Sequence, residues 1–383
     1  MTLFLFLVII LCVACCNIGA SSKTLLDEQY HSTVSNNIIL HQVDNDFDCV
    51  DIYKQPALQH PLLKNHKIQL YPTFVKNIVR IRQSYRKTVN ECPTGKVPIY
   101  KRTRKHQIVT NSSNLQIEDF RHYSQSSPGY HTVTLDTTQN MTFHGAYAFI
   151  GVYNLSLQQN QYSASSIWVE SGPEIQRNSI RVGAEVHPSL YGDSQLRITG
   201  YWTVDGQKNN GCYNYDCSGF VQVNQMKNCT LGVPIDIKTG IGSTKKEFMG
   251  FRIQQDRSTG NWWLSFVPEP VFIIGYWPKQ LFTHLSTGAS LIRFGGQTYA
   301  PPNMDSPPMG SGRLPKEKYK NSGFMGSLQI IDSDYNQNDV KPKDMKRYSD
   351  TDSNCYDLWY HGDEGPFWRQ AFLYGGPGGK CSI

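Results

Sequence analysis

The sequence of 383 residues contains ten cysteines, and seven of them follow residue 20. No two of these seven have the spacing of a zinc knuckle, so we expect no structural metal, and no cofactor motif is present. The sequence also lacks the Gly-x-Ser-x-Gly elbow of serine hydrolases and the His-Glu-x-x-His helix of zinc proteases. His60 and His66 share a short segment without a partner carboxylate or thiol, and we interpret them as surface or packing residues. The cysteines therefore indicate disulfides.

Three disulfides are predicted, because an oxidising compartment would pair six of the seven cysteines and leave one over. The predicted pairs are Cys49 with Cys92, Cys212 with Cys217, and Cys355 with Cys381. Gly211 and Asn214 give the short loop of the second pair its turn freedom. The third pair would hold the C-terminal tail, which otherwise tends to fray. Cys229 remains as the unpaired thiol.

The first twenty residues have the pattern of a secretory signal. Residues 3–13 form an apolar run, and Ala20 is a small residue suited to the position before cleavage. The run is shorter than the roughly 20 residues of a membrane helix. We predict a signal peptide over residues 1–20 and a secreted protein without membrane association; a short membrane anchor is the alternative. Four Asn-x-Ser/Thr sequons agree with secretion, and their asparagines are Asn111, Asn140, Asn154 and Asn228.

Positive charge is concentrated in the N-terminal third of the chain. Residues 21–129 contain 15 Lys/Arg and 9 Asp/Glu, whereas residues 130–383 contain 22 of each. The larger part is therefore neutral, which argues against a nucleic-acid partner. The densest basic run, at residues 101–105, suits either a solvated loop or a site for a protease that cuts after basic residues. Residues 101–128 are polar and lack a sustained apolar period, as expected of a linker.

After residue 130, short runs of aromatic and β-branched residues alternate with Gly, Pro, Asn and Asp. Their lengths and flanking turn residues are typical of strands, and they span residues 146–153, 164–169, 180–186, 196–204, 219–223, 248–253, 261–266, 271–277 and 290–294. No long stretch has a helical period. We predict an all-β sandwich or barrel over residues 130–383, preceded by a pro-segment and linker over residues 21–129.

Seven tryptophans and many tyrosines accompany these runs. Most of the rings would fill a core, but some could line a groove for an extended peptide or a sugar chain. Successive strand residues face opposite ways, so in the pair Tyr201 and Trp202 one ring can face the core and the other a cleft. With Trp168, these two are the candidate cleft-lining residues.

A series of ordered motifs resembles the plant neprosin family, secreted proteins that include glutamic peptidases cutting at proline. Three motifs are similar to the family's activation peptide: CVDIYKQPA (49–57), HPLLKNH (60–66) and CPTGKVPI (92–99). Others are similar to its peptidase domain, among them SIWV (166–169), VHP (186–188), YWTVDG (201–206), GCYN (211–214), GNWWL (260–264), IGYWP (274–278), MGSG (309–312) and YGGPGG (374–379). The resemblance implies a sandwich of two antiparallel sheets with a cleft across one face. It also implies a zymogen whose N-terminal unit covers the cleft.

Active members of this family use two glutamates, one to take a proton from water and one, protonated, to support the charge that develops on the scissile carbonyl. By resemblance, Arg181 stands at the first position and Gln297 at the second. Arginine stays protonated and glutamine is neither acid nor base, so neither can replace a glutamate. Ala184 also replaces a tryptophan expected in the cleft wall. Glu185 shares a face with Arg181 but lies roughly 13 Å along the strand, which we take to be out of reach.

We therefore expect a neprosin-like fold without the peptidase dyad, secreted to the extracellular space or cell wall. Its cleft would bind a peptide or protein, with Arg181 favouring a carboxylate and Gln297 a peptide group. Two alternatives remain: a working endopeptidase that uses other residues, and a protein that binds cell-wall polysaccharide through exposed aromatic rings.

Limited proteolysis tests the division of the chain. Because residues 101–128 contain few apolar side chains, we expect the first cut there, with the basic run at 101–105 as the preferred place. A stable fragment should begin between Lys101 and Tyr130, as read by mass spectrometry. A first cut well inside the strand-rich region would contradict the division.

Overall fold

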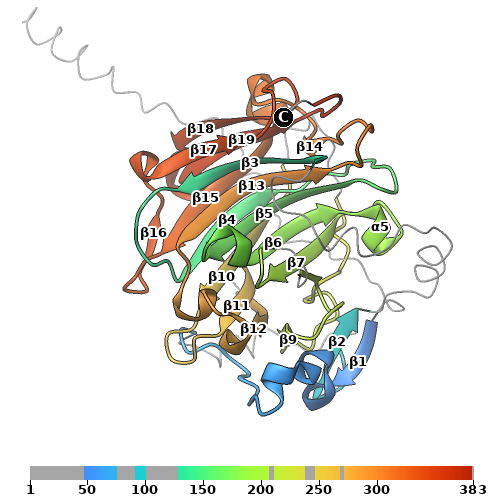
Figure 1. The fold of residues 1–383 in the computed structure, drawn as a ribbon, viewed down its shortest axis with the longest axis vertical. Coiled ribbons are helices and arrows are strands. Elements are labelled where there is room, and N and C mark those ends of the chain that lie inside the picture. Colours follow the sequence, from blue (N-terminus) through green and yellow to red (C-terminus); the bar gives the residue numbers. More distant parts are fainter. Residues whose placement is uncertain are drawn as a thin grey trace, which may run out of the picture.

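The computed structural model describes residues 47–75, 91–100, 128–206, 211–237, 246–267 and 271–381. The expected signal peptide, the basic run at 101–105 and the sequon at Asn111 lie outside these residues. Within the described ranges, the strands form three sheets, and every strand pair is antiparallel. Two large sheets lie face to face, so the predicted sandwich is confirmed and a closed barrel is not formed (Figure 1).

One large sheet has seven strands. In spatial order they are β17 (Met345–Ser349), β3 (Tyr130–Thr137), β13 (Leu291–Tyr299), β5 (Tyr162–Ser171), β6 (Asn178–Val186), β7 (Arg197–Thr203) and β8 (Cys212–Tyr213). The central strands β13, β5, β6 and β7 are aligned without register shifts over their length. Residues far apart in the sequence therefore stand in straight rows across this sheet.

The second large sheet has ten strands. Its main path is β14 (Met309–Gly310), β19 (Gln370–Gly376), β15 (Gly323–Ile331), β4 (Gly145–Gly151), β10 (Phe248–Gln255), β11 (Trp262–Val267), β12 (Phe272–Trp277) and β9 (Val221–Gln222). Strands β16 (Gln337–Asp339) and β18 (Asp357–Asp363) pair with β15 and β19. The described α-helices are single turns, namely α5 (Pro188–Tyr191), α6 (Lys318–Asn321) and α7 (Gly365–Trp368). None of the described helices is long and apolar enough to cross a membrane.

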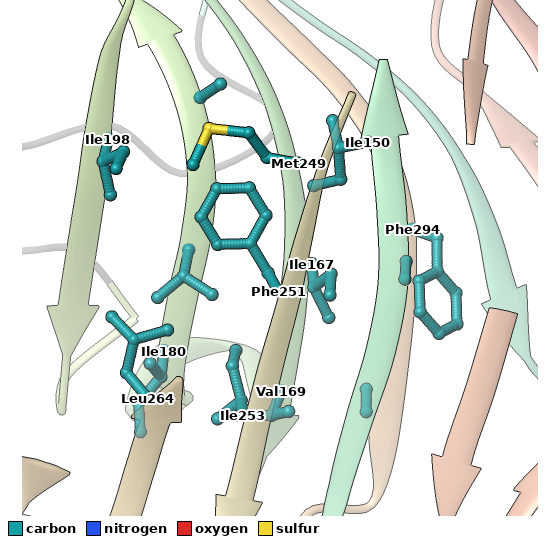
Figure 2. Close-up of a cluster of buried hydrophobic side chains, with 14 of the residues drawn as sticks. Ile150, Ile167, Val169, Ile180, Ile198, Met249, Phe251, Ile253, Leu264 and Phe294 are labelled. Atoms are coloured by element: carbon teal, nitrogen blue, oxygen red, sulfur yellow. The ribbon is translucent and has the colours of Figure 1, made fainter. Parts of the chain in front are cut away.

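The main hydrophobic core lies between the two large sheets. Alternate residues of β10 (Met249, Phe251 and Ile253) point toward residues of β5 such as Ile167 and Val169 (Figure 2). All five of these side chains are at most 1 % exposed. Burial of such side chains is the largest favourable term in folding, at roughly 25 cal/mol per Å² of apolar surface. The period-two pattern of the sequence thus places one face of each sheet in the core.

The three predicted disulfides are present in the structure. They join Cys49 to Cys92, Cys212 to Cys217 and Cys355 to Cys381. Cys229 is a buried free cysteine, and burial raises the pKa of its thiol to about 12. It is therefore protonated at ordinary pH and behaves as a small apolar side chain.

The N-terminal unit (residues 47–75 and 91–100) consists of a two-stranded sheet, β1 (Phe47–Asp51) and β2 (Lys96–Tyr100), with 3-10 turns between residues 52 and 63. It lies beside β9 at one end of the sandwich (Figure 1). The side chain of Gln55 accepts from the backbone N–H of Gln222 (2.8 Å) and donates to its carbonyl (3.2 Å). Gln55 thus pairs with the backbone of β9 at the end of the sheet, where an open edge would invite aggregation.

The carboxylate of Asp256 binds a second part of this unit, around Gln69 and Thr73. Asp256, in the loop between β10 and β11, accepts hydrogen bonds from the N–H (2.5 Å) and hydroxyl (2.9 Å) of Thr73 and from the amide of Gln69 (3.0 Å). His66 hydrogen-bonds the hydroxyl of Tyr276 (2.8 Å), consistent with its predicted packing role. Burial alone would raise the pKa of Asp256, but the hydrogen bonds from Thr73 and Gln69 outweigh it and lower the pKa.

The docking of residues 66–75 should therefore weaken at acid pH. A carboxylate with a lowered pKa stabilises the docked form above its unfolded pKa of about 3.9, and this contribution is lost as the pH falls through the lower, folded value. Asp256→Asn should cost about 1–3 kcal/mol, because it removes a charged acceptor of several hydrogen bonds. Hydrogen-exchange protection of the Gln69 and Thr73 amides measures the change, with the exposed Asp334→Asn as control. Equal protection in both variants would contradict the role of Asp256.

Candidate functional site

Arg181 and Gln297 lie on the same face of the seven-stranded sheet, although 116 residues separate them. In β6, Ile180, Val182 and Ala184 belong to the core between the sheets. Arg181 alternates with them and points to the opposite side, the outer face. Ala184 therefore cannot form part of a cleft wall on the outer face, and that expectation is wrong. The alternation of side chains along β6 thus places Arg181 on the outer face and Ala184 in the core.

The two side chains touch across the intervening strand β5. Nη1 of Arg181 donates to Oε1 of Gln297 at 2.6 Å, and the hydroxyl of Tyr162 donates to the same oxygen at 2.6 Å. The Gln297 amide nitrogen donates to the Thr132 hydroxyl at 3.2 Å. On β5, the residue aligned with Gln297 is Ala164, whose small side chain leaves room for the arginine to cross. The two sequence-predicted positions thus form one site.

Glu185 belongs to this site, contrary to the expectation that it lies out of reach. Nη2 of Arg181 donates to Oε2 of Glu185 at 3.1 Å and lies 3.1 Å from the hydroxyl of Tyr213. The other carboxylate oxygen accepts from Nδ1 of His187 at 2.6 Å. The estimate of roughly 13 Å applies to the backbone, and the long arginine side chain spans that gap. Arg181 thus neutralises a carboxylate four residues along its own strand.

The guanidinium of Arg181 is enclosed by three rings. Its carbon lies 5.1 Å from the ring centroid of Tyr201, 5.7 Å from Tyr213 and 5.8 Å from Tyr162. Arg181 is 5 % exposed and Glu185 1 %. Burial by itself would lower the pKa of Arg181, but Tyr213, Glu185 and Tyr162 together raise it well above the ordinary value. Arg181 is therefore a permanent cation that cannot take a proton from water.

The three aromatic residues predicted to line a cleft do not all lie on the same face of the seven-stranded sheet. Tyr201 packs against Arg181 on the outer face, and Trp168 is aligned with Arg181 on the neighbouring strand. Trp202 instead belongs to the core and packs edge-on against Phe282 at 6.0 Å. The prediction that Trp202 lines a cleft is wrong, because its neighbour Tyr201 occupies the outer face and alternation turns Trp202 inward.

Sequence reasoning did not find several residues of the site. His187 follows Glu185 by two and lies directly after β6, so alternation carried one residue past the strand was a usable signal for it. Tyr162, Tyr213 and Thr132 come from three other strands, and only strand pairing brings them to Arg181 and Gln297. Within the described residues, no group of three or more His, Cys, Asp or Glu side chains is arranged to hold a metal ion.

The neprosin family model matches residues 159–377, which is more than half of the chain, and the neprosin activation peptide model matches residues 42–149. This chain belongs to the neprosin family. The second match includes the N-terminal unit that docks on β9 and on Asp256.

Solved structures of glutamic peptidases are similar to this neprosin family member. Scytalido-glutamic peptidase with a peptide-based transition state analogue has 8 % identity, a TM-score of 0.34, and a match over 65 % of this chain and 97 % of its own. The same enzyme with a transition state analogue inhibitor has 10 % identity, a TM-score of 0.34, and covers 64 % and 98 %. SCP-B, an eqolisin family peptidase in complex with the tripeptide Ala-Ile-His, has 9 % identity, a TM-score of 0.32, and covers 64 % and 96 %.

Arg181→Ala should destabilise the protein by about 3–5 kcal/mol, because it leaves the buried carboxylate of Glu185 without its cation. The double variant Arg181→Met with Glu185→Gln removes both charges and should cost clearly less than the single one. Urea unfolding followed by tryptophan fluorescence gives both values. Arg347→Ala is the control: its ion pair with Asp357 is partly exposed, so the expected loss is below about 1 kcal/mol. A double variant less stable than Arg181→Ala would contradict the charge pairing.

Proposed function

We propose that this protein is a secreted member of the neprosin family that binds peptides in its cleft without hydrolysing them. The observation that carries the proposal is the hydrogen bond between Arg181 and Gln297 at 2.6 Å. In this proposal, the two residues occupy the positions of the family's two glutamates. A permanent cation and a neutral amide offer no acid–base pair, so an attacking water has no group to take its proton.

The ion pair between Arg181 and Glu185 changes which ligands the site can bind. Arg181 was expected to attract a carboxylate, but Glu185 already neutralises it, and the donors of its Nη1 and Nη2 are directed to Gln297, Glu185 and Tyr213. Arg181 itself is therefore a poor ligand-binding cation. The proposed peptide contacts fall on other groups of the outer face.

Secretion and processing belong to the same proposal. The three disulfides suit an oxidising compartment. Asn140 and Asn154 are exposed and suit glycosylation, whereas Asn228 is partly buried beside Cys229. The N-terminal unit would act as a pro-segment, separable at the linker of residues 101–128.

A second candidate function is a peptidase that uses other residues. The contact between Glu185 and His187 at 2.6 Å favours it, because a carboxylate that holds Nδ1 orients an imidazole for general-base work. Binding of cell-wall polysaccharide has less support. Six of the seven tryptophans are at most 4 % exposed, and Trp359 is the exception at 44 %.

We expect no cleavage of proline-containing peptides by the native protein, either full-length or cut in the linker. Gln297→Glu alone should remain inactive, because Nη1 of Arg181 would pair with the new carboxylate and depress its pKa. Arg181→Glu combined with Gln297→Glu should restore weak cleavage at acid pH, measured by mass spectrometry of the products. Arg347→Glu with Gln337→Glu, on the exposed surface, is the matched control.

Robust cleavage by the native protein that survives Arg181→Ala and Gln297→Ala would overturn the proposal. Loss of that cleavage in Glu185→Gln and in His187→Gln would then identify the second candidate. General-base catalysis contributes about 10² to 10⁴ in rate, so a true loss is readily measured.

A further inference from the structure

The N-terminal unit covers part of the outer face of the ten-stranded sheet, where β9, β11 and β12 lie side by side. Trp262 faces the core between the two sheets, so alternation along β11 turns Trp263 outward. The outward cluster on these strands is at most 5 % exposed and consists of Val221, Trp263, Ile273 and Tyr276. Ala57 of the unit belongs to the same cluster, and further side chains of the unit pack against it, namely Ile68, Phe74 and Val75.

Departure of the unit would expose this outward cluster to water. A Trp or Tyr side chain has about 150–250 Å² of surface to bury, and the rings of Trp263 and Tyr276 lie together, with their centroids 4.5 Å apart. Soluble monomers rarely expose contiguous apolar patches larger than a few hundred Å². The cluster therefore favours a bound unit over a bare sheet.

The unit also contributes to the main hydrophobic core. Leu63 is 1 % exposed and Phe47 6 %, and both belong to the main core cluster. At the end of β2, Tyr100 packs edge-on against Tyr191 at 6.0 Å, and the guanidinium of Arg197 lies 5.5 Å from the centroid of its ring. Together with the hydrogen bonds to β9 and to the loop between β10 and β11, these contacts hold both described parts of the unit.

The unit has little of its own to keep it folded. Its separate apolar cluster contains three buried residues, namely Ile52, Val97 and Ile99. A core of this size cannot offset the conformational entropy of the chain, even with the disulfide between Cys49 and Cys92. The unit would therefore lose its structure on leaving the sandwich, which adds to the cost of release.

We propose that the N-terminal unit stays bound after the linker is cut, so that the processed protein is a complex of two chains held together by noncovalent contacts. The inference rests on the proposed processing in the linker and specifies its product, in which the unit is a permanent subunit rather than a released pro-segment. The disulfide between Cys49 and Cys92 keeps the two described parts of the unit on one piece. The outward cluster that binds the unit lies on the ten-stranded sheet, whereas Arg181 and Gln297 lie on the seven-stranded sheet.

Size-exclusion chromatography of a cut protein tests this inference. The full-length protein is made with a site for a sequence-specific protease between Gln116 and Ile117, in the linker, and is cut after it has folded. At neutral pH and about 1 μM protein, we expect the unit and the sandwich to elute together, because their dissociation constant should lie below about 1 μM. Native mass spectrometry of the peak should give the summed mass of the two chains.

Two matched pairs of variants locate the contact in the cut protein. Gln55→Ala removes buried hydrogen bonds to β9 and should raise the dissociation constant about tenfold or more, whereas Gln59→Ala, at an exposed position, should leave it unchanged. Leu63→Asp places a carboxylate in the core and should release the unit, while Leu62→Asp, at 59 % exposed, should retain it. Release should also shift the tryptophan fluorescence to longer wavelength, because Trp263 becomes exposed. If Leu63→Asp does not fold before the cut, the first pair decides.

Elution of the unit as a separate, later peak from the cut protein at neutral pH would overturn the inference. Equal dissociation constants for Gln55→Ala and Gln59→Ala would also overturn it, since the contact with β9 would not be what holds the unit. An uncut linker in the secreted native protein would instead contradict the proposed processing. The engineered cut decides separately whether the unit is retained, so the two failures are distinguishable.

Discussion

The central strands of the seven-stranded sheet are buried on both faces, and this constraint governs the site. All nine residues of β6 are buried, although five of them are polar, charged or glycine. On one face, the apolar side chains of β6 pack against the other large sheet. The outer face carries charged and hydrogen-bonding groups that have to satisfy one another, because an unpaired buried charge is far more costly than a paired one.

This constraint explains why the residues of the site form a set. An arginine at position 181 needs an anion within reach, and Glu185 on the same face supplies it. Glu185 in turn accepts from His187, and Gln297 accepts from Arg181 and Tyr162. A glutamate at position 297 would add a second anion next to the same guanidinium. The site is therefore a compensated ion pair inside an aromatic enclosure.

The same outer face also contains an arginine whose donors are not all hydrogen-bonded. Arg293 lies in the row of Arg181, but its Nε and Nη1 have no hydrogen-bond partner, although the carboxylates of Glu170 and Asp136 lie beside it. Two arginines of equal charge thus differ in how well their neighbours satisfy their donors. At the end of the sandwich, Gln55 and Asp256 show a third use of polar groups, since they bind the N-terminal unit to the sheet edge and to a hairpin loop.

The sequence alone determined the fold class and the disulfide pairs, because these depend on local alternation, spacing and motifs. Motifs also pointed to Arg181 and Gln297, which the structure brings into contact. It missed strands such as β3, β15, β17, β18 and β19, and it ended β13 at Phe294, before Gly295 and Gly296. These glycines continue the strand for a tertiary reason: a Cβ at Gly295 would lie 2.1 Å from the carbonyl oxygen of Val133.

Only the tertiary structure decided which partners each side chain meets. Alternation states that Tyr201 and Trp202 face opposite ways, but the packing of the second sheet decides that Trp202 is the one in the core. Likewise, backbone spacing separates Glu185 from Arg181, and the length of the arginine side chain joins them. Sequence patterns give the direction of a side chain along one strand, whereas contacts across strands depend on register and reach, which no local pattern contains.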